Sequence, residues 1–145
     1  MKIWLNGKFV KEEDAKVDIT SSGFLYGQGV FETMRAYNER VFRLDSHLER
    51  LFNALSILNL GLAAGPEVLK KAVKQALKEN NLKDAYLRIT VWQGKDKAEA
   101  AVFARAYNFL NKEDYCKGFK AIVSNFRQNE FSVLSGIKSA NYLHL

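Results

Sequence analysis

The chain has 145 residues, of which 48% are hydrophobic and 26% charged, a balance typical of globular proteins and of neither disordered nor membrane proteins. The single cysteine, Cys116, excludes an internal disulfide and a cysteine-rich metal site, so we expect no metal, and it fits a reducing cytoplasm. The net charge of +6 suits anionic cofactors or acidic substrates as well as nucleic acid. No nucleic-acid recognition motif accompanies this charge, so we do not expect nucleic acid as a partner. No uncharged run is long and apolar enough to span a bilayer, so we do not expect a membrane either.

The predicted strands pair as hairpins. They comprise residues 3–5, 8–10, 30–37, 41–44, 85–92 and 100–107. Asn6-Gly7 lies between the first two and is a strong signal for a two-residue hairpin turn. Asn38-Glu39-Arg40 separates the next two, and the polar loop of residues 93–99 joins the last two.

A turn punctuated by glycines, Gly23 to Gly29, precedes the strand at residues 30–37. Glycine accepts positive φ and allows close approach to the backbone, so this turn indicates contact with a ligand or a second chain element, although an ordinary loop also explains it. Along the strand, Phe31 and Arg35 point to one face and Glu32 to the other. Neither face is entirely apolar, so at least one is expected to line a cleft, while Glu32 and Arg35 are expected to pair within the sheet in a structural role.

Two amphipathic helices are predicted between the fourth and fifth strands. The first begins at the capping box Ser46-x-x-Glu49 and ends with Gly61 as its C-cap residue. The second has Pro66 in its first turn and ends at Asn80. Together with the hairpins, these helices predict an α+β fold, a two-layer small domain with a mostly antiparallel sheet and two helices.

The densest group of lysines lies along the second predicted helix, opposite its apolar face. Its members are Lys70, Lys71, Lys74 and Lys78. A row of this kind is usually a solvated helix surface, and we assign it no ligand. A small basic RNA-binding protein is the alternative that this row leaves open.

A change to polar, charged composition divides the chain. Residues 1–110 are expected to form the small N-terminal domain, residues 111–117 an interdomain linker, and residues 118–145 the beginning of a second domain. Within that last part, residues 118–124 are predicted to form a strand whose apolar side chains and open edges invite pairing with another chain. Residues 138–145 resemble the approach to a helix.

Four basic residues are candidates for chemistry. Arg50 lies early in the first predicted helix, where backbone N–H groups and the helix dipole favour an anion, and its guanidinium suits a phosphate. His47 lies one turn away and would support the anion or orient the arginine, although an exposed arginine beside a satisfied histidine is the alternative. Lys138 has an apolar, glycine-flanked setting suited to an amine that reacts with an aldehyde, but a lysine with its head in water also fits. Arg88 projects from an apolar strand, where an arginine usually has an anionic partner.

Four motifs, in this order, resemble those of the class IV (fold-type IV) pyridoxal-phosphate enzymes. They are Tyr26 to Thr33, His47 to Leu51, Ala85 to Arg88 and Lys138 to Leu143. The family contains the branched-chain and D-amino-acid aminotransferases and the aminodeoxychorismate lyases. Each motif alone is weak, but four in order are specific. The resemblance covers the whole chain and implies the N-terminal half of a family member.

The resemblance implies pyridoxal 5′-phosphate (PLP) as the cofactor and assigns roles to residues of this chain. Lys138 would form the Schiff base with the cofactor and then move the Cα proton of the substrate. Arg50 would anchor the cofactor phosphate, with His47 in support. The substrate side would be shaped by Tyr26, Phe31 and Arg88. Residues 118–145 would then begin the larger, PLP-binding domain.

Gln28 and Phe31 depart from the family pattern, and Thr33 bears on the choice between its subclasses. Gln28 stands where an aspartate is common, which alters a turn hydrogen bond and leaves the reaction unchanged. Phe31 stands where the D-amino-acid enzymes have a tyrosine, which disfavours that subclass. Branched-chain enzymes usually have glycine at the position of Thr33, which leans towards the lyase or a less specialised aminotransferase.

The favoured function is amino-group transfer between an amino acid and a 2-keto acid. Elimination of pyruvate by an aminodeoxychorismate lyase stays open, as does a non-catalytic association module. We expect a cytoplasmic protein that acts as a homodimer or with the missing C-terminal half. Because family active sites lie between two domains, the 145-residue chain is expected to be inactive alone.

Overall fold

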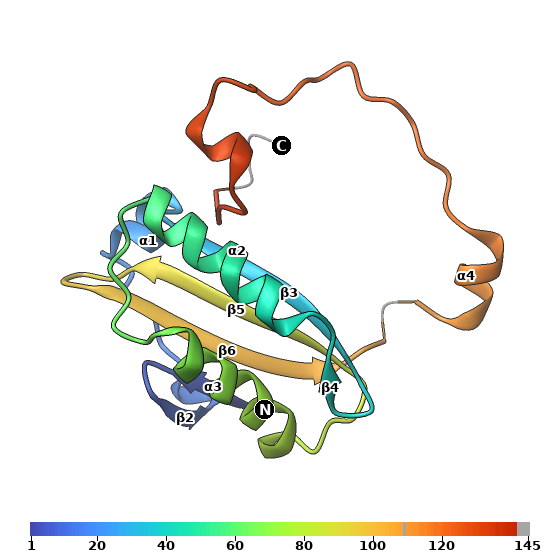
Figure 1. The fold of residues 1–145 in the computed structure, drawn as a ribbon, viewed down its shortest axis with the longest axis horizontal. Coiled ribbons are helices and arrows are strands. Elements are labelled where there is room, and N and C mark those ends of the chain that lie inside the picture. Colours follow the sequence, from blue (N-terminus) through green and yellow to red (C-terminus); the bar gives the residue numbers. More distant parts are fainter. Residues whose placement is uncertain (109, 142–145) are drawn as a thin grey trace.

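The computed structural model describes residues 1–108 and 110–141. Six strands form one antiparallel sheet in the order β2-β1-β6-β5-β3-β4. They are β1 (Lys2–Leu5), β2 (Lys8–Lys11), β3 (Gly29–Tyr37), β4 (Arg40–Val41), β5 (Ala85–Gln93) and β6 (Ala98–Ala106). Helices α2 (Leu44–Ile57) and α3 (Pro66–Glu79) cover one face of this sheet (Figure 1). The predicted two-layer α+β fold is therefore confirmed.

The hydrophobic core lies between these two layers. Leucines of α2 and aliphatic side chains of α3 recur at helical spacing and pack on alternate residues of the central strands. The fully buried set includes Leu51, Leu69, Val73, Leu87, Ile89, Val91 and Val102. Each such side chain contributes about 1.5–3 kcal/mol on burial, so the helices are held mainly by this face.

The hairpin turns follow the sequence closely. Asn6 and Gly7 both have positive φ, which makes a tight two-residue turn between β1 and β2. Asn38 and Glu39 do the same between β3 and β4. The second arm is shorter than predicted, since β4 ends at Val41 and α2 begins three residues later.

The predicted capping box of α2 is wrong. The helix begins at Leu44, two residues before Ser46, and Arg43 precedes it in the left-handed region without any side-chain cap. Leu44 is 7% exposed. Because its side chain packs in the core, the helix starts earlier than the local polar pattern indicates.

The predicted C-cap of α2 is also wrong. Asn59 (φ 51°), and not Gly61, takes the left-handed position after the helix. The Leu60 N–H then donates to the Leu55 carbonyl at 2.9 Å, and the Asn59 N–H to the Ser56 carbonyl at 3.1 Å, which is a Schellman motif. Asparagine tolerates this conformation, so a glycine is not required.

Two short helical segments precede β3. Residues Glu12–Asp14 form a 3₁₀ turn, and α1 (Ser22–Tyr26) occupies much of the glycine-rich stretch that was predicted as a turn. The Ser21 side chain accepts the Phe24 N–H, and Gly27 ends α1 with φ 65°. The helix therefore places the last glycines at the start of β3.

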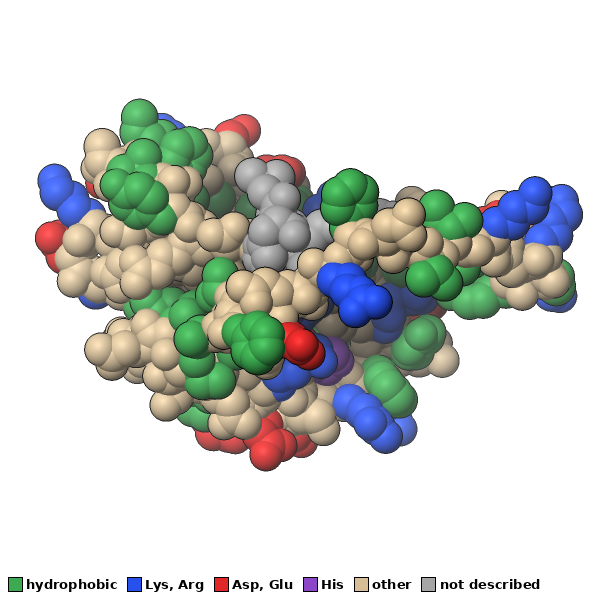
Figure 2. Space-filling view, turned by 90° about the horizontal axis from the view of Figure 1, so that it is seen from above, with side chains coloured by type: hydrophobic (Ala, Val, Ile, Leu, Met, Phe, Trp, Pro, Cys, Tyr) green, Lys and Arg blue, Asp and Glu red, His purple; other side chains and the backbone are tan. Residues whose placement is uncertain are grey.

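The chain beyond β6 departs from the sheet and returns to it (Figure 1). A capped helix, α4 (Lys112–Lys117), occupies the predicted linker. The predicted strand at residues 118–124 is wrong for the described chain, because no strand pairs with it there, and Ile122 and Val123 are more than 90% exposed. Hydrophobic side chains are accordingly visible on the surface of this projecting part (Figure 2).

The last described residues lie against the sheet. A 3₁₀ turn, Val133–Gly136, leads into an extended segment at residues 138–140. The predicted approach to a helix is not seen there, and residues 142–145 lie outside the described part. Among the described helices, none is long and apolar enough to cross a membrane.

Candidate active site

The predicted site residues lie around the first residues of β3 in two groups, one on each face of the sheet. Side chains alternate along a strand, so Phe31 and Glu32 point in opposite directions. Phe31 contacts Arg88 and Lys138, whereas Glu32 binds side chains of α2. The structure thus collects most of the predicted residues at one end of one strand.

Main-chain hydrogen bonds hold the lysine segment beside β3. The Phe31 N–H donates to the Lys138 carbonyl at 3.1 Å, and the Ala140 N–H donates to the Gly29 carbonyl at 2.8 Å. This edge of β3 is available because β4 pairs only with the far end of the strand. Ser139, in an antiparallel bridge with Val30, is 3% exposed. Lys138 is therefore fixed by backbone geometry.

The glycine-rich turn allows this close approach. A Cβ on Gly27 would lie 3.2 Å from the Asn141 Cβ, and Gly27 also has positive φ. Gly29 makes room for the neighbouring strand β5 instead, because a Cβ there would lie 2.6 Å from the Val91 carbonyl oxygen. Asn141 Nδ2 further donates to the Tyr26 carbonyl at 3.4 Å. The prediction that this turn contacts a second chain element is confirmed.

Two cationic groups surround the Phe31 ring. The Arg88 guanidinium carbon lies 3.8 Å from the ring centroid, and Lys138 Nζ lies 4.7 Å from it. Arg88 Nε donates to Thr90 Oγ1 at 3.0 Å. The expected anionic partner of Arg88 is not found in the described part of the chain, because the face of the sheet around it presents aromatic and hydroxyl groups. This group suits an incoming carboxylate.

On the other face, a buried carboxylate binds two basic side chains. Glu32 is completely buried. Arg50 donates to it twice, through Nε and Nη2, each at 2.6 Å, and His47 Nδ1 lies 2.8 Å from its second oxygen. The Arg50 side chain is nevertheless 58% exposed. A buried, bidentate acceptor thus orients a guanidinium whose side chain reaches the surface.

The predicted pairing of Glu32 with Arg35 is wrong. The two residues lie three apart in a strand, so their side chains point to opposite faces. Arg35 instead packs on aromatic rings, with its guanidinium carbon 3.0 Å from the Tyr107 ring centroid and 5.0 Å from that of Tyr37. Glu32 was not identified from the sequence as the acceptor for His47 and Arg50. The signal was that these two basic residues share one face of a helix, because such a face is expected to pack against a carboxylate.

Tyr26 lies apart from the Phe31 group. The residue is 71% exposed, and its described link to the site is through its backbone carbonyl. The reason is that Tyr26 is the last residue of α1, whose exposed face carries the aromatic ring. Of the three residues predicted to shape the substrate side, the structure brings together Phe31 and Arg88.

The sequence of this chain is similar to those of known aminotransferases. The profile of the family "Amino-transferase class IV" matches residues 29–145. A putative branched-chain-amino-acid aminotransferase of Methanocaldococcus jannaschii is 39% identical over 99% of this chain and 53% of its own length. The chain spans about half the length of such curated relatives.

Two solved structures show the same arrangement of elements. The branched-chain amino acid aminotransferase of Escherichia coli superposes with a TM-score of 0.84 and 27% identity, over 96% of this chain and 49% of its own. The T.th. branched-chain amino acid aminotransferase, complexed with N-(5′-phosphopyridoxyl)-L-glutamate, gives a TM-score of 0.71 and 31% identity, over 76% and 41% of the two chains.

Proposed function

Because the chain belongs to the class IV amino-transferase family, we propose that it supplies the lysine-bearing side of a PLP site in an aminotransferase. The observation that carries this proposal is the hydrogen-bonded segment that holds Lys138 beside Phe31 and Arg88. A solved relative with a phosphopyridoxyl amino acid supports the choice of cofactor.

The residues present fit this cofactor. Lys138 offers a primary amine at a fixed main-chain position, and Arg50 offers a guanidinium for the phosphate. Glu32 accepts from Nε and Nη2 of Arg50 and so orients the guanidinium, and the Arg50 side chain is 58% exposed, where a phosphate can approach it. His47 would act through Glu32. When bound, PLP supplies an electron sink for negative charge at the substrate Cα.

Different side chains of this chain would then move the substrate proton, bind the substrate carboxylate and exclude water. Lys138 Nζ would take the proton from the substrate Cα and return it, acting as a general base. Arg88 would bind the substrate carboxylate, and the Phe31 ring would pack beneath both groups and exclude water. Tyr26, at the exposed end of α1, would border the entrance.

Transamination between an amino acid and a 2-keto acid is the reaction we favour over pyruvate elimination. The similar proteins named above are branched-chain aminotransferases. We further propose that residues 1–110 form the small domain, residues 111–117 the linker, and residues 118–145 the start of the cofactor domain. A second copy, or a downstream half like that of the relatives, would complete the site in the cytoplasm.

Covalent labelling tests this proposal. The chain is incubated with PLP, reduced with borohydride, digested and mapped by mass spectrometry. We expect the pyridoxyl adduct mainly on Lys138, and its loss in Lys138→Arg. Lys120→Arg, a matched change of an exposed lysine in the extended segment, should leave the adduct in place. Equal labelling of surface lysines would reject the role of Lys138.

A further inference from the structure

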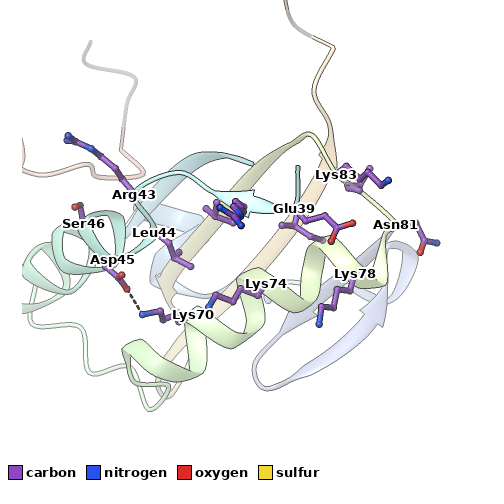
Figure 3. A pocket seen from close by; sticks show the side chains of 14 residues that line it. Glu39, Arg43, Leu44, Asp45, Ser46, Lys70, Lys74, Lys78, Asn81 and Lys83 are labelled. Atoms are coloured by element: carbon purple, nitrogen blue, oxygen red, sulfur yellow. Dashed lines mark ion pairs between the residues drawn. The ribbon is translucent and has the colours of Figure 1, made fainter. Parts of the chain in front are cut away.

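A groove lies on the helical side of the sheet, apart from the residues of the candidate active site. It has a volume of about 870 Å³ and opens between α3, the β3–β4 turn and the beginning of α2 (Figure 3). We call it the α3 groove. Neither Lys138 and its neighbours nor the Glu32 group lines it, so the proposed aminotransferase site does not account for it.

The floor of the α3 groove is apolar. Leu44 and Leu77 are 7% and 2% exposed, and they belong to the core between α2 and α3. Val41 and Leu82 are partly buried and pack against that core. The groove therefore offers an apolar surface of the kind that receives the body of a small ligand.

The rim of the groove is strongly basic. It carries two acidic side chains, Glu39 and Asp45, and six basic ones, which are Arg40, Arg43, Lys70, Lys74, Lys78 and Lys83. The three lysines of α3 recur every four residues and lie in one row, inclined towards the beginning of the helix (Figure 3). This excess of positive charge in a hollow favours anions.

The basic charges of the row are only partly compensated. Asp45 forms an ion pair with Lys70 at 2.6 Å (Figure 3). For the residues that the structure describes, no ion pair joins Lys74, Lys78 or Lys83 to a carboxylate. Their charges are therefore available to a ligand.

The walls of the groove are tied together at both ends. At one end, the Lys70–Asp45 ion pair links α3 to the beginning of α2. At the other, the Glu39 N–H donates to the Lys83 carbonyl at 2.8 Å, which links the β3–β4 turn to the loop after α3. The cavity is thus built into the fold, whereas Lys71, on the same helix, lies outside it.

We propose that the α3 groove binds a small organic polyanion of the nucleoside-polyphosphate class, with its aromatic body on the apolar floor and its phosphates on Lys74 and Lys78. The volume lies within the 300–1,000 Å³ range typical of small-molecule sites. Glu39 and Asp45 stand at separate points on the rim (Figure 3), where they would repel a long phosphate chain running past. This argues for a compact ligand and against a nucleic-acid strand.

Binding of ATP to the purified chain at low ionic strength tests the proposal, by calorimetry and by NMR shifts of backbone amides. We expect saturable binding with the largest shifts at Leu44, Lys74 and Leu77, and weakening as salt screens the charges. Inorganic tripolyphosphate, which lacks the aromatic body, should bind at least about fivefold more weakly, a difference of about 1 kcal/mol.

Two variants with the same change of net charge separate the groove from general attraction. Lys74→Gln/Lys78→Gln should weaken ATP binding about tenfold or more. Lys71→Gln/Lys95→Gln, at exposed positions outside the groove, should change it less than about twofold. Circular dichroism checks that both fold, and Lys138→Arg should bind ATP normally, which keeps this test independent of the proposed aminotransferase site.

The proposal is overturned by any of three results. Both double variants could lose affinity equally, tripolyphosphate could bind as tightly as ATP, or a single-stranded oligonucleotide could displace ATP at lower phosphate concentration. The first would show diffuse attraction, the second an unspecific phosphate site, and the third a nucleic-acid surface.

Discussion

Glu32 and Arg50 form a bidentate ion pair between the sheet and α2, with both nitrogen–oxygen distances at 2.6 Å. The carboxylate is fully buried, while the arginine side chain is 58% exposed. The direction of the guanidinium is therefore set from the interior of the domain. His47 adds a third contact to the same carboxylate.

Glu32→Gln should lower the free energy of unfolding by about 1–3 kcal/mol, because an amide cannot accept all three contacts and leaves charged donors without their partner. Urea denaturation measures the loss. The matched control is Glu49→Gln, which changes an exposed glutamate on α2 and should alter the free energy of unfolding by less than about 0.5 kcal/mol. In combination with Arg50→Gln the losses should fall short of additive, and strict additivity would show that the pair is not coupled.

Arg50→Ala should weaken PLP binding roughly ten- to a hundredfold, since a bidentate charge-assisted contact contributes about 1.5–3 kcal/mol. Arg50→Lys should recover only part of the loss, because a point charge cannot reproduce the planar fork. Equilibrium titration with PLP provides the measurement. Unchanged affinity in Arg50→Ala would remove Arg50 from the phosphate site.

Ala140→Pro should release the segment that carries Lys138. Proline has no N–H to donate to the Gly29 carbonyl, so this hydrogen bond is lost. Hydrogen exchange at the Phe31 amide, which donates to the Lys138 carbonyl, should become faster. Lys120→Pro, in the extended segment, should leave that amide unchanged. If the Phe31 amide exchanged equally slowly in Ala140→Pro and Lys120→Pro, the hydrogen bond from Ala140 would not be what holds the Lys138 segment beside β3.

Asn59→Gly should stabilise the domain by up to about 1 kcal/mol, because glycine occupies the left-handed region without steric cost. Gly61→Ala should be neutral or mildly stabilising, since Gly61 has no positive φ and an added Cβ meets open space. Thermal unfolding compares the two. Strong destabilisation by Gly61→Ala would restore Gly61 as the helix cap.

Glu79 provides a prediction of pH dependence. Hydrogen bonds from Lys2 and then Gln75, together with the charge of Lys2, lower the pKa of Glu79 below its ordinary value. Its contribution to stability is therefore present above the ordinary glutamate pKa and is lost as pH falls through the depressed one. Lys2→Gln should raise this pKa in an NMR titration, while Lys8→Gln, on the next strand, should not. A Glu79 pKa unaffected by Lys2→Gln would rule out the ion pair as the cause.

Local features of the fold were predictable from the sequence, and distant ones were not. The Asn6-Gly7 turn and the start of α3 at Pro66 are determined by the residues at those positions, so a short stretch of sequence is enough to predict them. The start of α2 depends on the burial of Leu44, which local capping signals do not record. The predicted strand at residues 118–124 finds no partner strand within residues 1–108 and 110–141, and a strand requires one.

The candidate site divides in the same way. Arg50, His47 and Lys138 were found through motifs, and Phe31 was found through a departure from one of them. The choice of Glu32 as the shared acceptor depends on which strand face meets α2, and that is a property of the packed domain. The neighbourhood of Lys138 and β3 likewise arises only when segments from both ends of the chain meet.

The order of strands in the sheet has a consequence for how the chain folds. Trp4 of β1 pairs with Val102 of β6, so the N-terminal hairpin cannot reach its place until almost the whole domain has left the ribosome. The partners of β3 also arrive late, first β5 and then the lysine segment. Such distant contacts slow folding, and α2 with α3 can form before the sheet is complete. The segment that carries Lys138 is thus made after the strand that it contacts, so it can dock onto a sheet that has already begun to form.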